Sequence, residues 1–313
     1  MKYLVTGGLG FIGSHFIECL LKDSNTKYIL NVDSGSYAAN KNFRPQDSRY
    51  DFLLCDIGDK DKVKRLQICF DVVVNFASHS HVDNSISNPN EFIDNNIKSF
   101  FNFLEVCKHW DKANKFKKIV HISTDEVFGD ALDIHSQFDE SSNFRPSSAY
   151  SASKASQEMF LHSARKMSGL KANILRMCNN YGPRQHSEKF IPVVLDKILN
   201  GQKIPIYGSG DQKREWLYVT DAVKKIKAVC ENIQDLNDYC ISSDITLSNL
   251  ELVNKANHLF NNGNQSNIDF IVDRVGHDRV YSTSDDKFRF AYPDLRDSFS
   301  LEQGLIKTYE SLR

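Results

Sequence analysis

The chain begins with Tyr3-Leu-Val-Thr-Gly-Gly-Leu-Gly-Phe-Ile-Gly13, a short apolar run followed by a glycine-rich turn. The apolar run is typical of a strand, and helical periodicity over residues 14–21 follows it. Glycines at positions 7, 10 and 13 permit a tight turn, close approach of the backbone to a pyrophosphate, and close packing of the helix on the strand. The spacing is Gly-x-x-Gly-x-x-Gly, which alone is a weak signal because glycine-rich turns are common.

A second apolar run strengthens this interpretation. Tyr28-Ile-Leu-Asn-Val-Asp33 reads as a strand that ends in an acid twenty residues beyond Gly13. A strand, a glycine-rich turn, a helix and a second strand with a terminal acid form the pattern of a dinucleotide-binding unit. The Asp33 carboxylate can accept hydrogen bonds from both ribose hydroxyls of adenosine and would repel a 2′-phosphate. The sequence therefore predicts that the cofactor is NAD and not NADP.

Further apolar runs continue the alternation of strands and helices. Strands are predicted at 51–55, 72–77, 118–122 and 170–176, and helices at 91–110 and 150–167. This order predicts an α/β fold, a Rossmann-type doubly wound parallel sheet. Beyond residue 180 the elements become shorter and turn signals denser. We predict an NAD-binding domain over 1–180, to which some later segments return, and a smaller C-terminal α/β substrate domain over 181–313.

The rest of the cofactor site is expected at the carboxyl edge of the same sheet. Asp56 and Ile57 follow the third strand and can border the adenine, although an ordinary loop acid fits the spacing nearly as well. His79 and His81 follow the fourth strand, but no nearby cysteine or third histidine completes a site, so no metal is predicted. The additional expected cofactor contacts are Phe11, Ile12, Ser34, Ser36 and Ala77.

Composition excludes several other classes of protein. Lys plus Arg total 39 against 40 Asp plus Glu in 313 residues, so no overall positive field exists to hold nucleic acid or an anionic membrane. No apolar run reaches the length of a membrane span, and the start of the chain leaves no room for a secretory signal. The seven cysteines are scattered singly, without a Cys-x-x-Cys pair. We predict a cytoplasmic protein.

Candidate catalytic residues follow the strand at 118–122. Ser123-Thr-Asp-Glu126 lies at the carboxyl end of that strand, where open α/β sheets place their ligands. Tyr150 and Lys154 are four residues apart at the start of a helical pattern, so they share one helix face. An isolated Asp-Glu pair is usually a solvated loop feature. Its position beside the predicted cofactor site favours a catalytic role here.

Two other features suggest partners. Four basic residues of the second half could clamp a diphosphate, since guanidinium groups match phosphate oxygens, although each alone is more often a surface charge. They are Lys189, Arg214, Arg274 and Arg279. The helices at 91–110 and 150–167 carry an excess of large apolar residues, which could seal a homodimer through a helix bundle or simply pack in the core. We predict the dimer.

Nearly the whole chain resembles the extended short-chain dehydrogenase/reductases, and among them the nucleotide-sugar 4,6-dehydratases. The motifs that match are Thr6-Gly-Gly-Leu-Gly-Phe-Ile-Gly-Ser-His15, Ser80-His-Val-Asp-Asn-Ser85, His121-Ile-Ser-Thr-Asp-Glu-Val-Phe-Gly129, Tyr150-Ser-Ala-Ser-Lys154, Asn179-Asn-Tyr-Gly-Pro183 and Arg214-Glu-Trp-Leu-Tyr-Val219. The Asp-Glu pair discriminates most, because related epimerases and decarboxylases generally lack it. Ser34-Gly-Ser-Tyr37 replaces a segment in which the thymidine-diphosphate branch typically has a lysine, and Asn95-Asn96 replaces Thr-Asn. The first departure concerns the contact with the ribose. Asn95-Asn96, together with Asn84, is closer to the UDP-glucose dehydratases and favours UDP-glucose over dTDP-glucose as the substrate.

The resemblance implies a reaction and roles for the residues. Tyr150, with its pKa lowered by Lys154 and by the nicotinamide charge, takes the 4-hydroxyl proton as hydride passes from C4 to NAD. Glu126 then removes the C5 proton, Asp125 protonates the departing 6-hydroxyl, and Thr124 holds the 4-oxygen. The resemblance places Asn180 on the cofactor side and a set of substrate ligands opposite: Ser80, Asn179, Lys189, Arg214, Asn249, Arg274 and His277. A 4-epimerase, which needs only Tyr150, Lys154 and NAD, and a catalytically silent NAD-binding protein are the alternatives.

Overall fold

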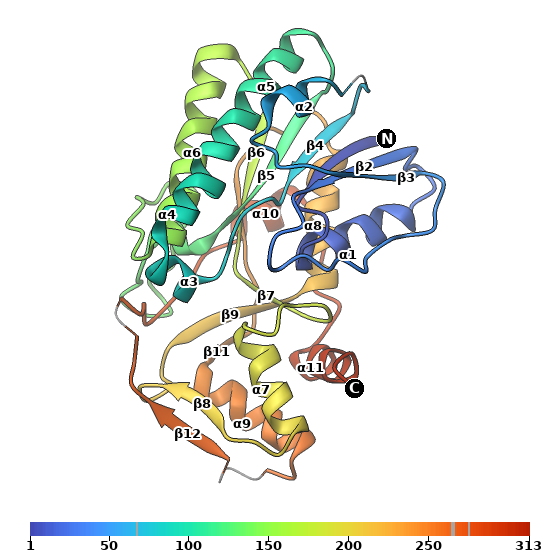
Figure 1. Cartoon of the computed structure of the whole chain (residues 1–313). Coiled ribbons are helices and arrows are strands. Elements are labelled where there is room, and N and C mark those ends of the chain that lie inside the picture. The colour runs from blue at the N-terminus through green and yellow to red at the C-terminus, as the bar shows by residue number, and fades with distance from the viewer. Residues whose placement is uncertain (67, 264–266, 275) are drawn as a thin grey trace.

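The computed structural model describes residues 1–66, 68–263, 267–274 and 276–313, and its largest element is a seven-stranded sheet. The strand order is β10-β6-β5-β4-β1-β2-β3, and every neighbouring pair is parallel (Figure 1). The strands are β1 (Lys2–Thr6), β2 (Tyr28–Asp33), β3 (Tyr50–Leu54), β4 (Val72–Asn75), β5 (Lys118–Thr124), β6 (Ala172–Met177) and β10 (Tyr239–Ile241). Strand order reverses between β1 and β4, which creates a crevice at their carboxyl ends.

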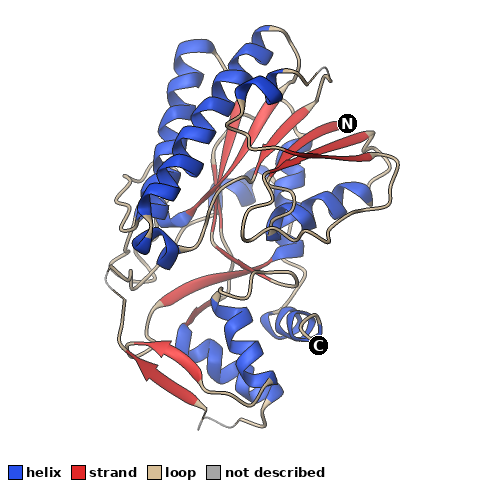
Figure 2. Ribbon diagram, in the orientation of Figure 1, coloured by secondary structure: helices blue, strands red, loops and turns tan. Residues whose placement is uncertain are grey.

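Helices cover both faces of this sheet (Figure 2). On one face, α1 (Phe11–Leu21) and α8 (Val219–Glu231) contribute Phe16, Ile17 and Ile226 to one apolar core. On the other, α2 (Lys60–Lys64), α5 (Phe100–Lys112) and α6 (Ala149–Ser168) contribute to a second core, which includes Phe103 and Leu161. Because both faces are buried, the central strands are apolar almost throughout.

The helix predicted at 91–110 has a different form in the structure. The chain forms α3 (Val82–Ser87) and α4 (Pro89–Phe92), then a π-helix, η1 (Ile93–Ser99), and only then α5. In η1, the side chain of Asn96 is fully buried and hydrogen-bonded to the backbone of His79. A wider π-turn is common near functional sites, and apolar spacing alone does not reveal it.

A smaller part of the molecule lies beyond the carboxyl edge of the large sheet (Figure 1). It has a three-stranded sheet of β11 (Thr246–Ser248), β9 (Lys213–Tyr218) and β7 (Asn179–Tyr181), and a parallel pair, β12 (Ile268–Ile271) and β8 (Ile204–Tyr207). The helices α7 (Phe190–Leu199), α9 (Asn249–Phe260) and α11 (Leu301–Glu310) pack on these strands around a third apolar core, and α10 (Asp286–Ala291) packs near β10. The predicted α/β fold with a smaller C-terminal part is confirmed.

The chain crosses between the two parts more than once. α8 and β10 come after the first strands of the smaller part, yet they pack with the large sheet. The division at residue 180 remains a prediction. Within the described residues, no helix is both long and apolar enough to span a membrane. All seven cysteines are free thiols, and the cytoplasmic location also remains a prediction.

Candidate active site

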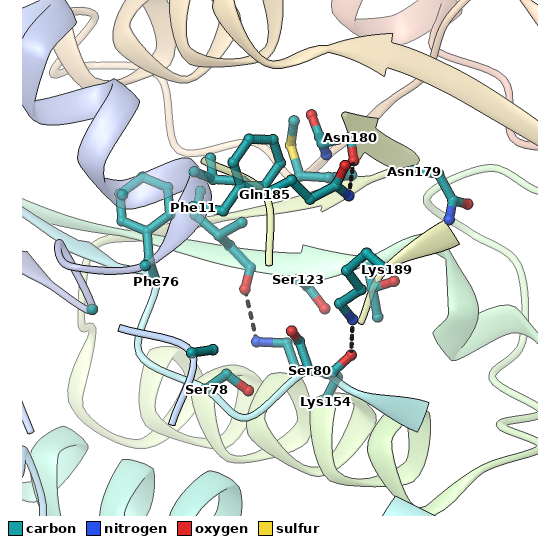
Figure 3. Close-up of a pocket in the computed structure, with 18 of the residues that line it drawn as sticks. Phe11, Phe76, Ser78, Ser80, Ser123, Lys154, Asn179, Asn180, Gln185 and Lys189 are labelled. Carbon is teal, nitrogen blue, oxygen red and sulfur yellow. Dashed lines mark hydrogen bonds between the residues drawn. The ribbon is translucent and has the colours of Figure 1, made fainter. Parts of the chain in front are cut away.

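The predicted catalytic residues share one cavity of about 250 Å³ at the carboxyl edge of the sheet. They reach it from two elements, the end of β5 with the short 3₁₀-helix η2 (Asp125–Phe128), and the first turns of α6. Figure 3 shows side chains from the glycine-rich turn, from α6 and from the segment after β7 pointing into the same space. The predicted catalytic residues that line this cavity are Thr124, Asp125, Glu126, Tyr150 and Lys154.

Local interactions set the positions of these side chains. Thr124 caps η2, since its Oγ1 accepts a hydrogen bond from the backbone N–H of Glu126 at 3.3 Å. Ser148 begins α6 through a reciprocal capping box with Ser151, which places Tyr150 in the first helical turn. The sequence thus fixes where η2 and α6 begin, and the catalytic groups lie at these two starts.

A second cavity of about 80 Å³ adjoins the first and continues toward β2 and β3. The two share Gly7, Gly10, Ala38, Phe76 and Ser78 in their linings. Each of the predicted cofactor residues lines one cavity or both: Gly7, Gly10, Phe11, Ile12, Gly13, Tyr150, Lys154 and Asn180 in the first, and Asp33, Ser34, Ser36, Asp56, Ile57 and Ala77 in the second. The arrangement is long enough to follow an extended ligand from β3 to β5.

The glycine-rich turn leaves space and hydrogen-bond donors for an anionic group. A Cβ at Gly7 would lie 2.6 Å from the backbone nitrogen of Ala77, and a Cβ at Gly13 would collide with the carbonyl oxygen of Gly7. Helix α1 starts at Gly10 without a side-chain cap and without an acid in its first turn, so its N-terminus can face a phosphate. These residues fit the pyrophosphate of a dinucleotide.

The Asp33 side chain lies in the second cavity, at the end of β2. Its carboxylate accepts from the backbone N–H of Leu9 at 2.9 Å and of Gly35 at 2.8 Å. Burial raises the pKa of Asp33, and these two donors oppose the rise. Since each carboxylate oxygen can accept more than one hydrogen bond, Asp33 retains capacity for ribose hydroxyls.

The adjacent carboxyls have different environments. Burial, followed by the charges of Glu126 and Glu215, raises the pKa of Asp125 well above its usual range. Burial also raises the pKa of Glu126, but the positive charges of Lys189, Arg214 and Arg274 oppose that rise. Asp125 is therefore the better proton donor and Glu126 the better base.

Burial shifts the pKa values of both Tyr150 and Lys154 toward their neutral forms. Burial and the charge of Glu126 raise the pKa of Tyr150, and a hydrogen bond with Thr124 opposes the rise. Burial lowers the pKa of Lys154 to about 7, and its ammonium donates to the carbonyl of Ile122 at 2.8 Å and to Gln157 Oε1 at 2.6 Å. The expectation that Lys154 and the nicotinamide charge together lower the pKa of Tyr150 stays a prediction, because burial dominates the pKa of both groups in the chain alone.

The predicted substrate ligands divide into two sets. Ser80, Thr124, Asn179 and Lys189 line the first cavity, and Lys189 Nζ donates to the carbonyl of Ser80 at 2.6 Å (Figure 3). Arg214, Asn249, Arg274 and His277 lie outside both linings. The charges of Arg214 and Arg274 still act on the pKa of Glu126, so both lie near the cavity.

The four predicted ligands that lie outside both cavities make contacts within the smaller part of the molecule or with α3. Arg214 lies over the Tyr281 ring at 4.0 Å, and Asn249 Nδ2 donates to Gln212 Oε1 at 3.4 Å. Arg274 Nη1 is 3.2 Å from Asp83 Oδ1, and His277 Nδ1 is 2.7 Å from Asp273 Oδ1. Arg279 is exposed, so nothing in the structure supports its expected place in a diphosphate clamp.

Sequence reasoning missed several residues that line the first cavity. They are Ala38, Phe76, Ser78, Met177, Cys178, Gln185, His186 and Glu188. Four flank residues that were predicted, so adjacency was a usable signal for Phe76, Ser78, Cys178 and Glu188. Ala38, Gln185 and His186 reach the cavity through loops whose course the sequence does not reveal. In the described part of the chain, no group of three or more His, Cys, Asp or Glu is placed to hold a metal ion.

The fold and these two cavities define a dinucleotide-dependent enzyme of the short-chain dehydrogenase/reductase class. A family model described as GDP-mannose 4,6 dehydratase matches residues 4–269. The dTDP-glucose 4,6-dehydratase of Salmonella typhimurium is 35% identical, with 99% of this chain and 92% of that protein covered. The chain belongs to the nucleotide-sugar 4,6-dehydratase family, a family of hydro-lyases.

Solved structures agree with this assignment. The structure of DesIV, a dTDP-glucose 4,6-dehydratase from Streptomyces venezuelae with NAD and TYD bound, has a TM-score of 0.93 and 34% identity and covers 100% of this chain and 97% of its own. A UDP-glucuronic acid 4-epimerase from Bacillus cereus, in complex with UDP-glucuronic acid and NAD, has a TM-score of 0.88 and 27% identity, with 100% and 99% covered. Because dehydratases and epimerases share the fold, the site residues must distinguish the two activities.

Proposed function

We propose that the protein is an NDP-glucose 4,6-dehydratase that converts its nucleotide sugar to the 4-keto-6-deoxy product with loss of water. One observation supports this most strongly. Asp125 and Glu126 lie in the same cavity as Tyr150, and their environments favour different protonation states. A 4-epimerase has no use for such a pair, whereas elimination of water needs one base and one acid.

We propose NAD as the cofactor of this chain. The uncapped start of α1 suits the pyrophosphate, and Asp33 at the end of β2 suits a free 2′-hydroxyl and disfavours a 2′-phosphate. Lys154 and Tyr150 lie at the other end of the ligand-sized space, beside the carboxyls. When bound there, NAD supplies a hydride acceptor at C4 of the sugar and a hydride donor for C6.

The residues of the chain then have separate tasks. Tyr150 takes the proton of the 4-hydroxyl, and Thr124, whose side chain acts on the pKa of Tyr150, holds the 4-oxygen. Because burial keeps the Tyr150 hydroxyl protonated in the chain alone, it acts as a base only when positive charge lies beside it. Once C4 is a ketone the C5 proton is acidic, so Glu126 can remove it while Asp125 protonates the leaving 6-hydroxyl.

The nucleobase of the substrate, uracil or thymine, is a separate question. The sequence favoured UDP-glucose, but the relatives do not support that preference: the Salmonella enzyme and DesIV are both dTDP-glucose 4,6-dehydratases. We therefore propose dTDP-glucose as the substrate. The diphosphate would be held by Lys189, with Arg214 and Arg274, whose charges already act within the cavity.

A product assay tests the substrate and the cofactor together. Protein loaded with NAD should convert dTDP-glucose to a product lighter by one water that shows the absorbance of a 4-keto sugar in base. UDP-glucose should react more slowly, and protein loaded with NADP should be inactive with either sugar. Faster turnover of UDP-glucose would restore the earlier preference, and a 4-epimer of unchanged mass would replace the dehydratase with an epimerase.

We also propose that two copies associate through the outer faces of α5 and α6. Phe101 and Phe160 are each more than one-third exposed, and their rings lie 5.1 Å apart in a tilted pair. Met159, next to Phe160 in α6, and Ile93, the first residue of η1, are exposed as well. Packing two such helix pairs together would bury these side chains in a helix bundle.

Sedimentation velocity measures this association directly. The protein should sediment as a dimer, and Phe160→Glu should sediment as a folded monomer because a charge would be buried in the interface. Val272→Glu, on an exposed residue far from α6 in the sequence, is the control and should remain dimeric. A monomeric wild-type protein would exclude the interface.

A further inference from the structure

A buried amide connects the Lys154 ammonium to the π-helical segment. Gln157 lies one helical turn after Lys154 on α6 and is fully buried. Its Oε1 accepts from Lys154 Nζ at 2.6 Å, and its Nε2 donates to the backbone carbonyl of Asn96 at 2.7 Å. One side chain therefore joins a proposed catalytic residue to η1.

The orientation of this amide follows from chemistry. An ammonium group can only donate and a carbonyl oxygen can only accept. Only one of the two amide orientations satisfies both neighbours, with oxygen toward Lys154 and nitrogen toward Asn96. In the flipped orientation, the amide nitrogen would face the Lys154 ammonium and the amide oxygen would face the Asn96 carbonyl. Neither pair can form a hydrogen bond, and unpaired polar groups are costly inside a protein.

Asn96 is itself held from three sides. Its Oδ1 accepts from the backbone N–H of His79 at 2.8 Å, and its Nδ2 donates to the carbonyl of His79 at 2.9 Å and to Ser153 Oγ at 2.8 Å. His79 lies between Ser78 and Ser80, both of which line the first cavity. Asn96 of η1 therefore holds two parts of the site in place: the segment Ser78–Ser80 that follows β4 and, through Gln157, the side chain of Lys154.

We propose that Gln157 is a positioning residue that aims the Lys154 ammonium into the cavity, with the carbonyl of Asn96 as its anchor. The ammonium has three N–H groups, of which one donates to Gln157 and one to the carbonyl of Ile122 at 2.8 Å. With two of its N–H groups engaged, the ammonium keeps a third for a partner in the cavity that Lys154 lines. The inference rests on the proposed function, because it gives Lys154 its task beside Tyr150.

The surrounding charges explain why a neutral amide suits this position. Three titratable groups surround Lys154. They are Tyr150 in the first turn of α6, His121 on β5 and Glu158 in α6. Glu158 raises the pKa of Lys154, but Arg176 binds Glu158 at 2.7 Å and balances much of its charge. Burial outweighs Glu158, so the pKa of Lys154 falls to about 7. Gln157 thus orients an ammonium that is readily deprotonated, without adding a charge.

Two substitutions at this position separate positioning from simple packing. Gln157→Leu keeps the volume and removes both hydrogen bonds, so substrate-driven reduction of bound NAD should slow roughly 10- to 100-fold, the effect of one hydrogen bond to a charged group. The KM for the nucleotide sugar should stay within about twofold, since the proposed sugar contacts lie elsewhere. Gln157→Glu keeps an acceptor for Lys154 and adds a negative charge. It should therefore recover part of the rate.

A readout independent of turnover follows the lysine itself. In cofactor-free protein with ¹⁵N-labelled lysine, NMR should give a Lys154 titration midpoint that is higher in Gln157→Glu and lower in Gln157→Leu than in the wild type. The charged form exists below the pKa, so a raised pKa should also extend the active pH range of Gln157→Glu upward. Ser156→Ala, on the neighbouring residue of α6, is the control and should match the wild type in every measurement.

The outcomes distinguish this inference from the proposed function. If the wild type fails to reduce bound NAD with substrate, the proposed function is wrong. If the wild type succeeds and Gln157→Leu has the same rate, Lys154 midpoint and pH profile, the positioning role is excluded. A Gln157→Leu protein that only loses thermal stability, with an unchanged rate per folded molecule, excludes it too. If Gln157→Leu fails to fold, the Lys154 midpoint and pH profile of Gln157→Glu decide, and wild-type values there contradict the proposal.

Discussion

Replacing Glu126 by Gln should leave an enzyme that oxidises its sugar at C4 and releases almost no dehydrated product. The amide has nearly the shape of the acid but cannot remove the C5 proton, whereas Tyr150 and Lys154 remain in place. Product formation should fall at least 100-fold to 10,000-fold, the usual effect of a positioned acid or base. Because the cofactor is not regenerated, the absorbance of enzyme-bound NADH should rise on mixing with substrate and persist.

Asp125→Asn provides the second half of this test. Its amide cannot protonate the leaving 6-hydroxyl, so this variant too should stall after oxidation. Asp139→Asn is a suitable control, because Asp139 is exposed in the loop that follows η2 and its carboxylate accepts hydrogen bonds from Ser141 and Ser142. Near-normal dehydration by Glu126→Gln would remove Glu126 from the elimination step and favour the epimerase alternative.

Replacing Tyr150 by Phe should stop the reaction earlier. The ring keeps its packing 6.4 Å from Phe92, but no hydroxyl remains to take the proton of the 4-hydroxyl. Oxidation at C4 should slow by roughly 100-fold to 10,000-fold. In contrast to Glu126→Gln, no NADH absorbance should develop on mixing with substrate, and stopped-flow spectroscopy measures this difference.

The control for this variant is another tyrosine. Tyr309→Phe alters a ring stacked on Phe260 at 4.2 Å in the smaller part, away from both cavities, and should behave like the wild type. Rapid formation of bound NADH by Tyr150→Phe would show that another group takes the first proton.

The sequence predicted the large sheet because its strongest signals are local. β2 was predicted with its observed limits, since an apolar run ends in an acid and turn residues follow. The glycine-rich turn, the acid at the end of β2 and the residues after β5 all lie at carboxyl ends of parallel strands. That geometry brings them to one edge regardless of loop details. The candidate cavity residues could therefore be named before the structure.

Features that depend on contacts between distant residues were not predicted. β10 has only three residues and gains its place from pairing with β6, so no periodicity identifies it. In the π-turn of η1, Asn96 binds the backbone of His79 and Ser153 of α6 at once, and these contacts join residues far apart in the sequence. Likewise, the pKa of Tyr150 depends on how deeply its hydroxyl is buried, which the sequence does not state.

Incorporation of solvent deuterium measures whether Glu126 exchanges a proton at C5 during each turnover. The wild-type enzyme turns over dTDP-glucose in deuterium oxide, and NMR and mass spectrometry locate deuterium in the product. Glu126 exchanges its proton with solvent before returning one, so the product should carry one deuterium at C5. It should carry none at C6, because the hydride delivered there comes from C4 of the substrate. A 4-keto-6-deoxy product without deuterium at C5 would contradict the account.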